Sequence, residues 1–213
     1  QKTAYEMLRS LVGSEMCIRD RMAIVLQEVV GSEHGNYFYP HISGVAQSYN
    51  YYPFSHMKPE EGFGLIALGL GKYVVDGEKA FRFSPQYPNL QINTPKQLFK
   101  NSQTEFFAVD LEHTDIDLLE GDTAGLKRLS IEDAERHGTL NHLASVFDVD
   151  NERIIPGLTN EGPRIINFAD ILKYNYIPLP NTIKFILDIV KESIGSPVEI
   201  EFAVDLNKDE NYK

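Results

Sequence analysis

Hydrophobic and polar positions alternate most strictly near the end of the chain. From position 198 to 204 every second residue is apolar, and the intervening positions hold Glu199, Glu201, Ala203 and Asp205. Side chains on a β-strand point to opposite faces in turn. The pattern therefore predicts a strand over 198–205 with one packed face and one acidic face.

The segment just before this strand has a helical period. Apolar residues recur with a spacing of three or four at Ile183, Ile186, Leu187, Val190 and Ile194. This spacing predicts an amphipathic helix over 181–194. We expect Asn181 to cap its start and Gly195 to end it.

Shorter runs predict the remaining elements. Apolar or aromatic segments indicate strands over 23–30, 37–48, 81–83, 105–111, 143–147 and 164–166, and a strand that runs into a glycine-rich turn over 63–71. A hairpin turn over 31–35 joins the first two, and Gly44 within the second marks a bulge or a close backbone approach. A short helix or an extended turn is expected over 72–76, and single helical turns over 95–100 and 168–172. A short helix opens at Ser130 with Asp133 in the capping position. Strands and helices do not alternate regularly, so the fold class is α+β.

Composition excludes several classes of protein. The 213 residues carry a formal net charge of -11, which argues against a nucleic-acid partner. The single cysteine, Cys17, excludes a disulfide framework and a cysteine-rich zinc site. No apolar run is long enough to cross a bilayer, so the chain is expected to be cytoplasmic with no membrane partner.

The first residues have a separate interpretation. Met-Cys-Ile-Arg-Asp-Arg at 16–21 resembles the translation of an adapter used in DNA sequencing libraries. We therefore expect 1–21 to be an artefact outside the fold, and 22–213 to be part of one domain. The alternative is a short amphipathic helix that caps the domain.

The acidic face of the last predicted strand has a chemical interpretation. Side chains two positions apart on a strand lie roughly 6.5–7 Å apart at the backbone. Glu199 and Glu201 could therefore share a divalent cation, and Mg²⁺ usually binds one or two carboxylates together with phosphate oxygens. The alternative is a surface strand whose acidic face meets water.

Several motifs resemble one family. The predicted helix over 181–194 is followed by a Gly-x-Pro turn and the strand Glu199-Ile-Glu-Phe202. This order is similar to the end of the ATP-grasp nucleotide-binding domain of phosphoenolpyruvate synthase and pyruvate phosphate dikinase. Earlier segments extend the resemblance: Ile24-Val-Leu-Gln-Glu-Val-Val, Ser43-Gly-Val-Ala and Gly69-Leu-Gly-Lys-Tyr-Val-Val-Asp-Gly77. The chain departs at Lys72, where the family usually has Glu, and over 94–162, which matches little.

The resemblance implies a site. Glu201 and Glu199 would be the metal ligands, with Glu201 also a nucleotide ligand, and Gln27, Gly69 and Gly71 would contact ATP or shape its pocket. The cofactors would be ATP and Mg²⁺. None of the six histidines has a metal-binding spacing, and the family's phosphorylated histidine belongs to another domain.

The resemblance also implies a function. The fold would be ATP-grasp-like, with a mixed or antiparallel sheet and flanking helices, and the domain would be incomplete. The intact enzyme would split ATP, phosphorylate a histidine in a downstream domain and pass the phosphoryl group to pyruvate. Those phosphohistidine and pyruvate-binding domains would be missing partners, so the chain alone would be inactive. The alternatives are an antibiotic phosphotransferase with the same nucleotide domain, a non-catalytic nucleotide-binding or regulatory module, and a structural α+β domain.

Overall fold

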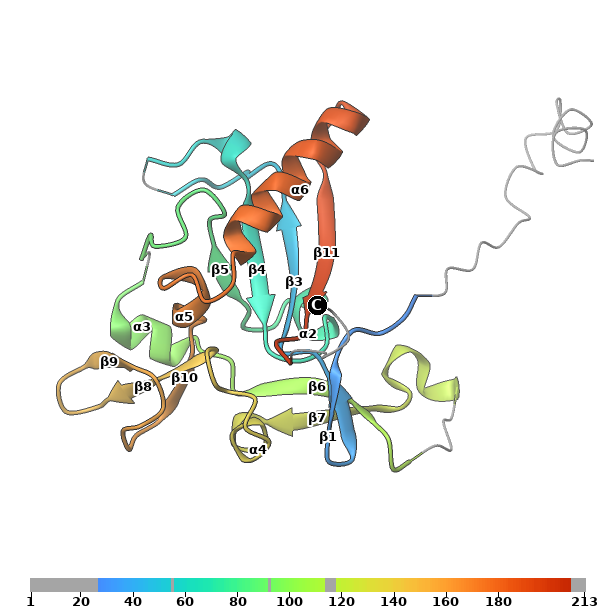
Figure 1. The fold of residues 1–213 in the computed structure, drawn as a ribbon, viewed down its shortest axis with the longest axis vertical. Helices are drawn as coiled ribbons and strands as arrows, with labels where there is room; N and C mark the ends of the chain where they lie inside the picture. Colours follow the sequence, from blue (N-terminus) through green and yellow to red (C-terminus); the bar gives the residue numbers. More distant parts are fainter. Residues whose placement is uncertain (1–26, 55, 92, 114–117, 208–213) are drawn as a thin grey trace, which may run out of the picture.

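The computed structural model describes residues 27–207, except 55, 92 and 114–117. The described residues form three β-sheets with short helices between them and one longer helix (Figure 1). Within each sheet the paired strands are antiparallel. This agrees with an α+β fold class.

The sheet that carries the predicted acidic strand has the order β11-β3-β4-β5, and we call it the central sheet. Its strands are β3 (Ile42–Gln47), β4 (Phe63–Ala67), β5 (Phe81–Phe83) and β11 (Glu199–Val204). Gly44 allows β3 to lie tightly between its neighbours, because a Cβ there would lie 2.5 Å from the Leu65 carbonyl oxygen and 2.6 Å from the Phe202 ring. The predicted close approach at Gly44 is confirmed.

The other two sheets flank one end of the central sheet (Figure 1). One has the order β1-β2-β6-β7, with β1 (Ser32–His34), β2 (Tyr37–Tyr39), β6 (Glu105–Asp110) and β7 (Leu126–Ser130). The other has the order β10-β8-β9, with β8 (Ala144–Asp148), β9 (Arg153–Pro156) and β10 (Arg164–Ile166). The helices are α2 (Lys72–Val75), α3 (Pro95–Lys100), α4 (Ile131–Arg136), α5 (Ala169–Leu172) and α6 (Leu179–Ile194), with 3-10 turns η1 (Pro59–Glu61) and η2 (Leu118–Thr123).

The main hydrophobic core joins all three sheets. Tyr39 of β2, Phe106 of β6 and Phe168, which precedes α5, are fully buried in it. Helix α6 contributes Ile183 and Leu187, which pack on one face of the central sheet. This is the face that carries the apolar side chains of β11. A smaller cluster lies between α2 and β6, around Tyr73, Val74 and Phe107.

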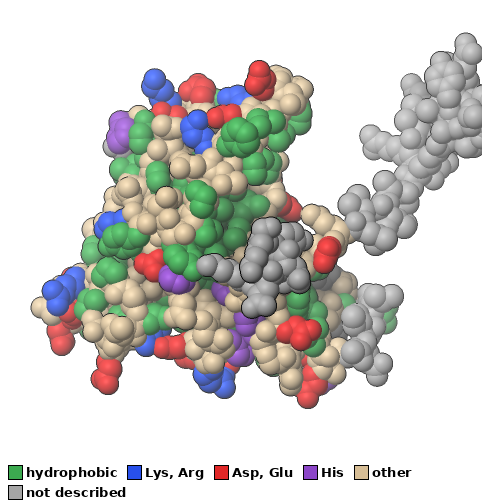
Figure 2. All heavy atoms as spheres, viewed as in Figure 1, with side chains coloured by type: hydrophobic (Ala, Val, Ile, Leu, Met, Phe, Trp, Pro, Cys, Tyr) green, Lys and Arg blue, Asp and Glu red, His purple; other side chains and the backbone are tan. Residues whose placement is uncertain are grey.

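Helix α6 also has an apolar side that remains exposed. Phe185 is 64% exposed and Ile189 is 46% exposed, and hydrophobic side chains are visible along the upper part of the molecule where α6 lies (Figure 2). The helix is 16 residues long, and within the described residues no helix has the length and apolarity needed to cross a bilayer.

Three local predictions were wrong. Residues 27–30 are not a strand, and 23–26 lie outside the described residues, as does the suspected artefact over 1–21. The hairpin instead joins β1 to β2, and the run over 37–48 breaks at Pro40 into strands of two different sheets. Proline lacks the amide proton needed to continue a ladder. Helix α6 begins at Leu179, two residues before the predicted cap Asn181.

Most other elements lie where the sequence predicts them. Strands β5 and β10 and helix α3 have the predicted bounds, and β11 differs by one residue at each end. The Ser130 hydroxyl accepts a hydrogen bond from the Asp133 amide, as predicted, and Gly195 ends α6 in a left-handed conformation. Strands β7 and β9 were not predicted; both are short and carry arginine or lysine within them.

Candidate functional site

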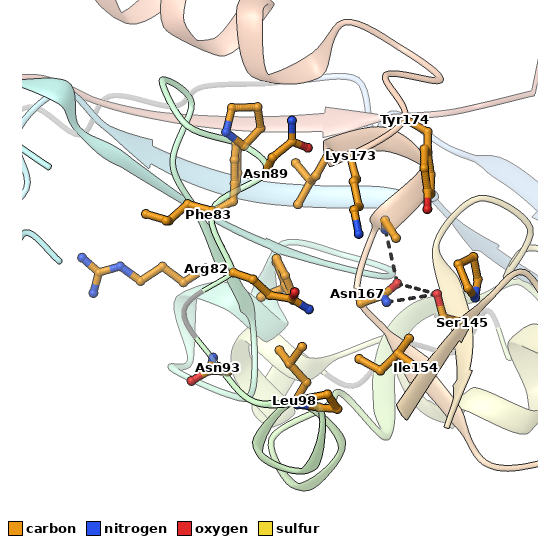
Figure 3. Close-up of a pocket in the computed structure, with 18 of the residues that line it drawn as sticks. Arg82, Phe83, Asn89, Asn93, Leu98, Ser145, Ile154, Asn167, Lys173 and Tyr174 are labelled. Carbon is orange, nitrogen blue, oxygen red and sulfur yellow. Dashed lines mark hydrogen bonds between the residues drawn. The ribbon is translucent and has the colours of Figure 1, made fainter. Parts of the chain in front are cut away.

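The predicted site residues of the central sheet lie outside the cavity that adjoins β5. A cavity of about 340 Å³ lies between β5, α3, α5 and the β8–β9 hairpin (Figure 3), and neither Glu199, Glu201, Gly69 nor Gly71 borders it. The acidic strand instead faces the open side of the central sheet, opposite the side covered by α6. We call this side the open face.

Strand register fixes which residues share the open face. Directly paired residues of antiparallel strands point to the same side. Glu201 pairs with Val45, which pairs with Leu65, and Leu65 pairs with Arg82. This row therefore runs across all four strands, from a carboxylate on β11 over two apolar residues to a guanidinium on β5.

A neighbouring row has similar chemistry. Glu199 pairs with Gln47, which pairs with Phe63. The Gln47 amide donates a hydrogen bond to the Glu199 carboxylate, and the Phe63 ring carries the Arg82 guanidinium 4.3 Å above its centre. Glu199 and Glu201 are both exposed, while the intervening residues of β11 are half-buried. The two carboxylates thus lie together on one surface, as the alternation predicts.

The glycine turn adjoins this surface through Ser43. Ser43 pairs with Ala203, two residues beyond Glu201 on the same side of β11. Its hydroxyl donates a hydrogen bond of 2.6 Å to the Gly69 carbonyl oxygen. The structure therefore brings the acidic strand, the Ser-Gly strand and the Gly69–Gly71 turn together along one edge of the open face.

The two glycines have different surroundings. Gly69 has φ +87°, and a Cβ there would lie 2.7 Å from both the Phe106 ring and the Phe107 carbonyl oxygen. Gly71 precedes α2, and a Cβ there would meet only the Ser43 Cβ, at 3.8 Å. The close contact with β6 thus requires glycine at position 69, whereas position 71 has room for a side chain.

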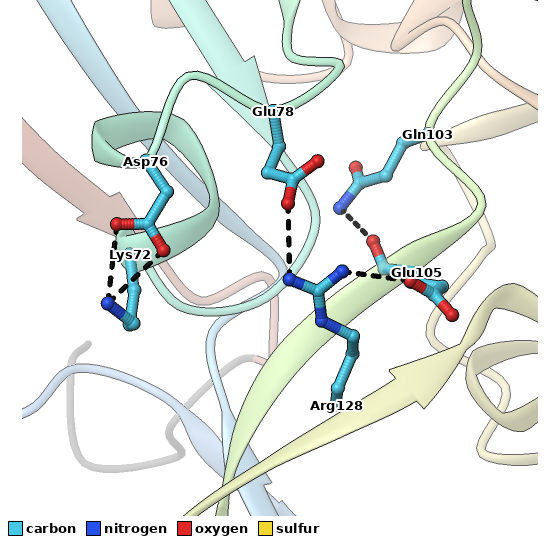
Figure 4. A network of polar contacts seen from close by, with 6 residues as sticks. All are labelled: Lys72, Asp76, Glu78, Gln103, Glu105 and Arg128. Atoms are coloured by element: carbon cyan, nitrogen blue, oxygen red, sulfur yellow. Dashed lines mark hydrogen bonds and ion pairs between the residues drawn. The ribbon is translucent and has the colours of Figure 1, made fainter. Parts of the chain in front are cut away.

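Buried and charged groups hold the turn against β6 (Figure 4). The buried Gln103 side chain accepts a hydrogen bond from the Leu68 amide and donates to the Leu68 and Glu105 carbonyl oxygens, each at 2.9 Å. Arg128 bridges Glu78 at 3.1 Å and Glu105 at 3.0 Å. These contacts join the segment after the turn to the second sheet and fix its position.

Lys72 stands at the first position of α2. Its amine lies 3.1 Å from the Asp76 carboxylate one helical turn later, and its side chain is 17% exposed. It also lies 6.0 Å from the Phe107 ring centre. The positive charge of Lys72 is thus directed along α2 and paired there.

Gln27 is at the start of the described residues and is exposed. Within the described part of the chain, no hydrogen bond or ion pair joins it to β11 or to the glycine turn. The structure therefore does not connect Gln27 to the acidic pair.

The donor set for a metal is small. Among the described residues, no group of three or more histidine, cysteine or acidic side chains could hold a metal ion. Two carboxylates without further protein ligands suit an ion that arrives with phosphate oxygens, since Mg²⁺ commonly binds one or two carboxylates plus substrate phosphates. They do not suit a dedicated protein cage.

The sequence did not single out Arg82 or Gln47 as site residues. Arg82 also donates a 2.8 Å hydrogen bond to the Asn50 side chain, so its guanidinium is fixed at the far edge of the open face. A signal was present, because Arg82 stands between Phe81 and Phe83, and strand alternation places it on the side opposite those two rings. Gln47 shows its role only once β11 is paired with β3.

The fold and the open face define an α+β domain whose sheet has carboxylates at one edge and a guanidinium at the other, with partly buried apolar residues between them that also pack against α2. Such a surface can support a planar, apolar group and bind a charged one beside it. Residues 17–212 match the family model described as the AMP/ATP-binding domain of pyruvate phosphate dikinase, and the chain belongs to that family. No curated protein and no solved structure matches the chain.

Proposed function

We propose that the chain is the ATP-binding part of a phosphotransferase of the phosphoenolpyruvate synthase and pyruvate phosphate dikinase type, with an ATP-grasp-like fold. ATP would lie on the open face of the central sheet. The family match over most of the chain supports this proposal. The observation that carries the location is the shared exposed face of Glu199 and Glu201, next to the Ser43–Gly69 contact.

Each group on the open face has a role in this proposal. Glu201 and Glu199 would hold Mg²⁺ bound to the phosphates, since carboxylates are ligands that this hard cation prefers. When bound, the ion would offset the negative charge of the phosphates. Gly71 has space for the backbone to approach the nucleotide, and Gln27 would contact it from the segment before β1. Val45 and Leu65 form an apolar floor between the charged edges.

The later chemistry would use other domains. The phosphoryl group would pass to a histidine of a downstream domain and then to pyruvate, as in a pyruvate, water dikinase. The 213-residue chain by itself would not catalyse this transfer. An antibiotic phosphotransferase would share the nucleotide domain and differ in the domain that receives the phosphoryl group.

The test is a calorimetric titration of ATP into the protein, with and without Mg²⁺. We expect Glu201→Gln to weaken the Mg²⁺-dependent binding by about tenfold or more, because even indirect partners of metal sites often contribute about 10–100-fold. Glu192→Gln changes an exposed glutamate on α6, outside the open face, and should bind as the wild type does. Equal ATP affinity in all three proteins would contradict the site.

A non-catalytic nucleotide-binding module is the second candidate, and Lys72 favours it. The family usually has Glu there, and here the lysine is paired with Asp76. ATP binding without release of AMP or phosphate by the complete gene product, supplied with pyruvate, would support this candidate. Steady formation of AMP would support the dikinase.

A further inference from the structure

The cavity of about 340 Å³ beside β5 lies outside the proposed nucleotide site. Phe81, Arg82 and Phe83 of β5 all border it, but strand register places the Arg82 side chain on the open face. Figure 3 shows the Arg82 side chain directed away from the cavity. The cavity and the open face are therefore on opposite sides of the central sheet.

Apolar and polar residues share the cavity wall about equally. Leu98 of α3, Ile154 of β9 and Leu172 of α5 approach it from three elements, and Phe83 forms part of the wall on β5. Small-molecule sites commonly have about 300–1,000 Å³ and mainly apolar walls with a few placed polar groups. The size therefore suits a small molecule with a single ring system.

The polar groups of the cavity wall include one lysine, two arginines and several side-chain amides. Lys173 extends into it near Asn89 and Asn167 (Figure 3). No carboxylate among the described residues forms an ion pair with Lys173, whose amine lies 5.9 Å from the Tyr174 ring centre. Of the two arginines in the wall, Arg153 is paired with Asp148 at 3.0 Å, and the Arg82 guanidinium donates to Asn50 instead.

Asn167 adds a fixed donor. It is buried, its side-chain oxygen accepts from the Ser145 hydroxyl at 3.1 Å and from the Ala169 amide at 3.2 Å, and its amide nitrogen donates to the same hydroxyl at 3.0 Å. An amide nitrogen carries two protons, and only one has an acceptor in the described residues. The orientation of Asn167 is thus fixed by three hydrogen bonds, with one donor left for a ligand.

Charge defines the ligand class. None of the described residues that line the cavity is acidic, and Lys173 is its one lysine. Among the cations of the wall, Lys173 alone both extends into the cavity and has no carboxylate partner among the described residues. Beside the amide donor of Asn167, it matches one negative charge with two acceptor oxygens. We propose that this cavity binds a small organic carboxylate with an apolar ring, independently of ATP.

The test uses naphthalene-2-carboxylate as the probe and naphthalene-2-carboxamide as its uncharged match. The ¹⁵N-labelled 213-residue chain is titrated with each, and backbone amide shifts are followed by NMR. We expect saturable shifts around Phe83, Ile154 and Leu172, with tighter binding of the carboxylate. Glu201→Gln should not alter either titration, which separates this site from the nucleotide site.

Lys173→Gln provides the matched variant. Because Lys173 is exposed, water screens its charge, and the carboxylate should bind roughly three- to fivefold more weakly while the carboxamide is unaffected. Lys100→Gln changes another exposed lysine, at the end of α3 and outside the cavity wall, and should leave both affinities unchanged. Shifts confined to the exposed side of α6, or the same carboxylate affinity in wild type and Lys173→Gln, would overturn the proposal.

Discussion

Gly69 and Gly71 belong to one motif but differ in what the structure demands of them. Gly69 has a left-handed backbone and lies against β6, while Gly71 has a helical backbone and open space. From the sequence both glycines were expected to serve the nucleotide. The structure supplies a packing reason for Gly69 that applies whether or not a nucleotide binds.

Substitution of Gly69 tests this difference. Gly69→Ala should lower the free energy of unfolding by about 2–5 kcal/mol, because a left-handed backbone costs about 1–2 kcal/mol and overpacking costs about 1–3 kcal/mol. Gly77→Ala is the control, since Gly77 has φ +75° but no atom within 4 Å of a Cβ. In that variant the free energy of unfolding should fall only by the cost of the left-handed backbone, about 1–2 kcal/mol. Urea denaturation measures both, and equal losses would show that the contact with β6 contributes little.

At the scale of single elements, helix starts separate a correct prediction from a wrong one. Ser130 caps α4 in the predicted way, whereas Asn181 lies inside the first turn of α6. Pro180 explains the error, because proline suits the first turn of a helix and permits the helix to begin before Asn181. The residue preference was right in kind, but two plausible starts lay side by side.

Alanine substitutions distinguish the two positions. Ser130→Ala should cost about 1 kcal/mol of stability, because it removes the hydroxyl that accepts from the Asp133 amide. Asn181→Ala should change stability by less than about 0.5 kcal/mol, since Asn181 is exposed and alanine favours a helix. Thermal unfolding of the two variants checks this. A larger loss for Asn181→Ala than for Ser130→Ala would indicate that α6 begins at Asn181 after all.

At the scale of the whole molecule, a group of histidines lies where β1, β2, β3, β11 and α4 meet. The His34 ring centre lies 5.7 Å from that of His41 and 6.0 Å from that of His137. His41 lies 2.6 Å from the Asp205 carboxylate, which also accepts from Ser32. The His34 Nε2 atom is buried and has no hydrogen-bond partner among the described residues. Elements far apart in the sequence therefore share one polar junction.

This junction should make stability depend on pH. Burial, with the charges of His41 and His137, lowers the pKa of His34 below its usual 6.5, against the opposing effect of Asp205. Burial also lowers the pKa of His137. The folded state therefore binds fewer protons than the unfolded state below about pH 6.5, and the free energy of unfolding should fall as the pH decreases from there. Urea titrations between pH 5 and 8 measure this.

Replacement of His34 identifies the source of that dependence. His34→Phe keeps an aromatic ring and removes one of the titrating groups, so the fall in stability below about pH 6.5 should be shallower. Asp205 does not explain the same range. Burial would raise its pKa, but hydrogen bonds from Ser32 and Asn207 and the nearby His41 hold the pKa below 3.8, so its contribution is lost only at lower pH. An unchanged slope in His34→Phe would exclude His34 as a cause.

The sequence by itself determined the local elements and the family. Alternation placed Glu199 and Glu201 on one side of β11, the helical period predicted α6, and glycine and serine positions predicted turns and a cap. These features depend on residues close together in the chain, whose backbone preferences and side-chain periods act over a few positions. The motifs were sufficient to indicate the family that the comparison then showed.

Only the tertiary structure decided which distant segments meet. The pairing of β11 with β3 brought Gln47 to Glu199, the pairing of β5 with β4 brought Arg82 to the open face, and α3, α5 and β9 enclosed the cavity around Lys173. Strand pairing and core packing join residues that are far apart in the sequence; Gln47 and Glu199, for example, are 152 positions apart. Such contacts depend on how the whole core is filled, and no local pattern specifies them.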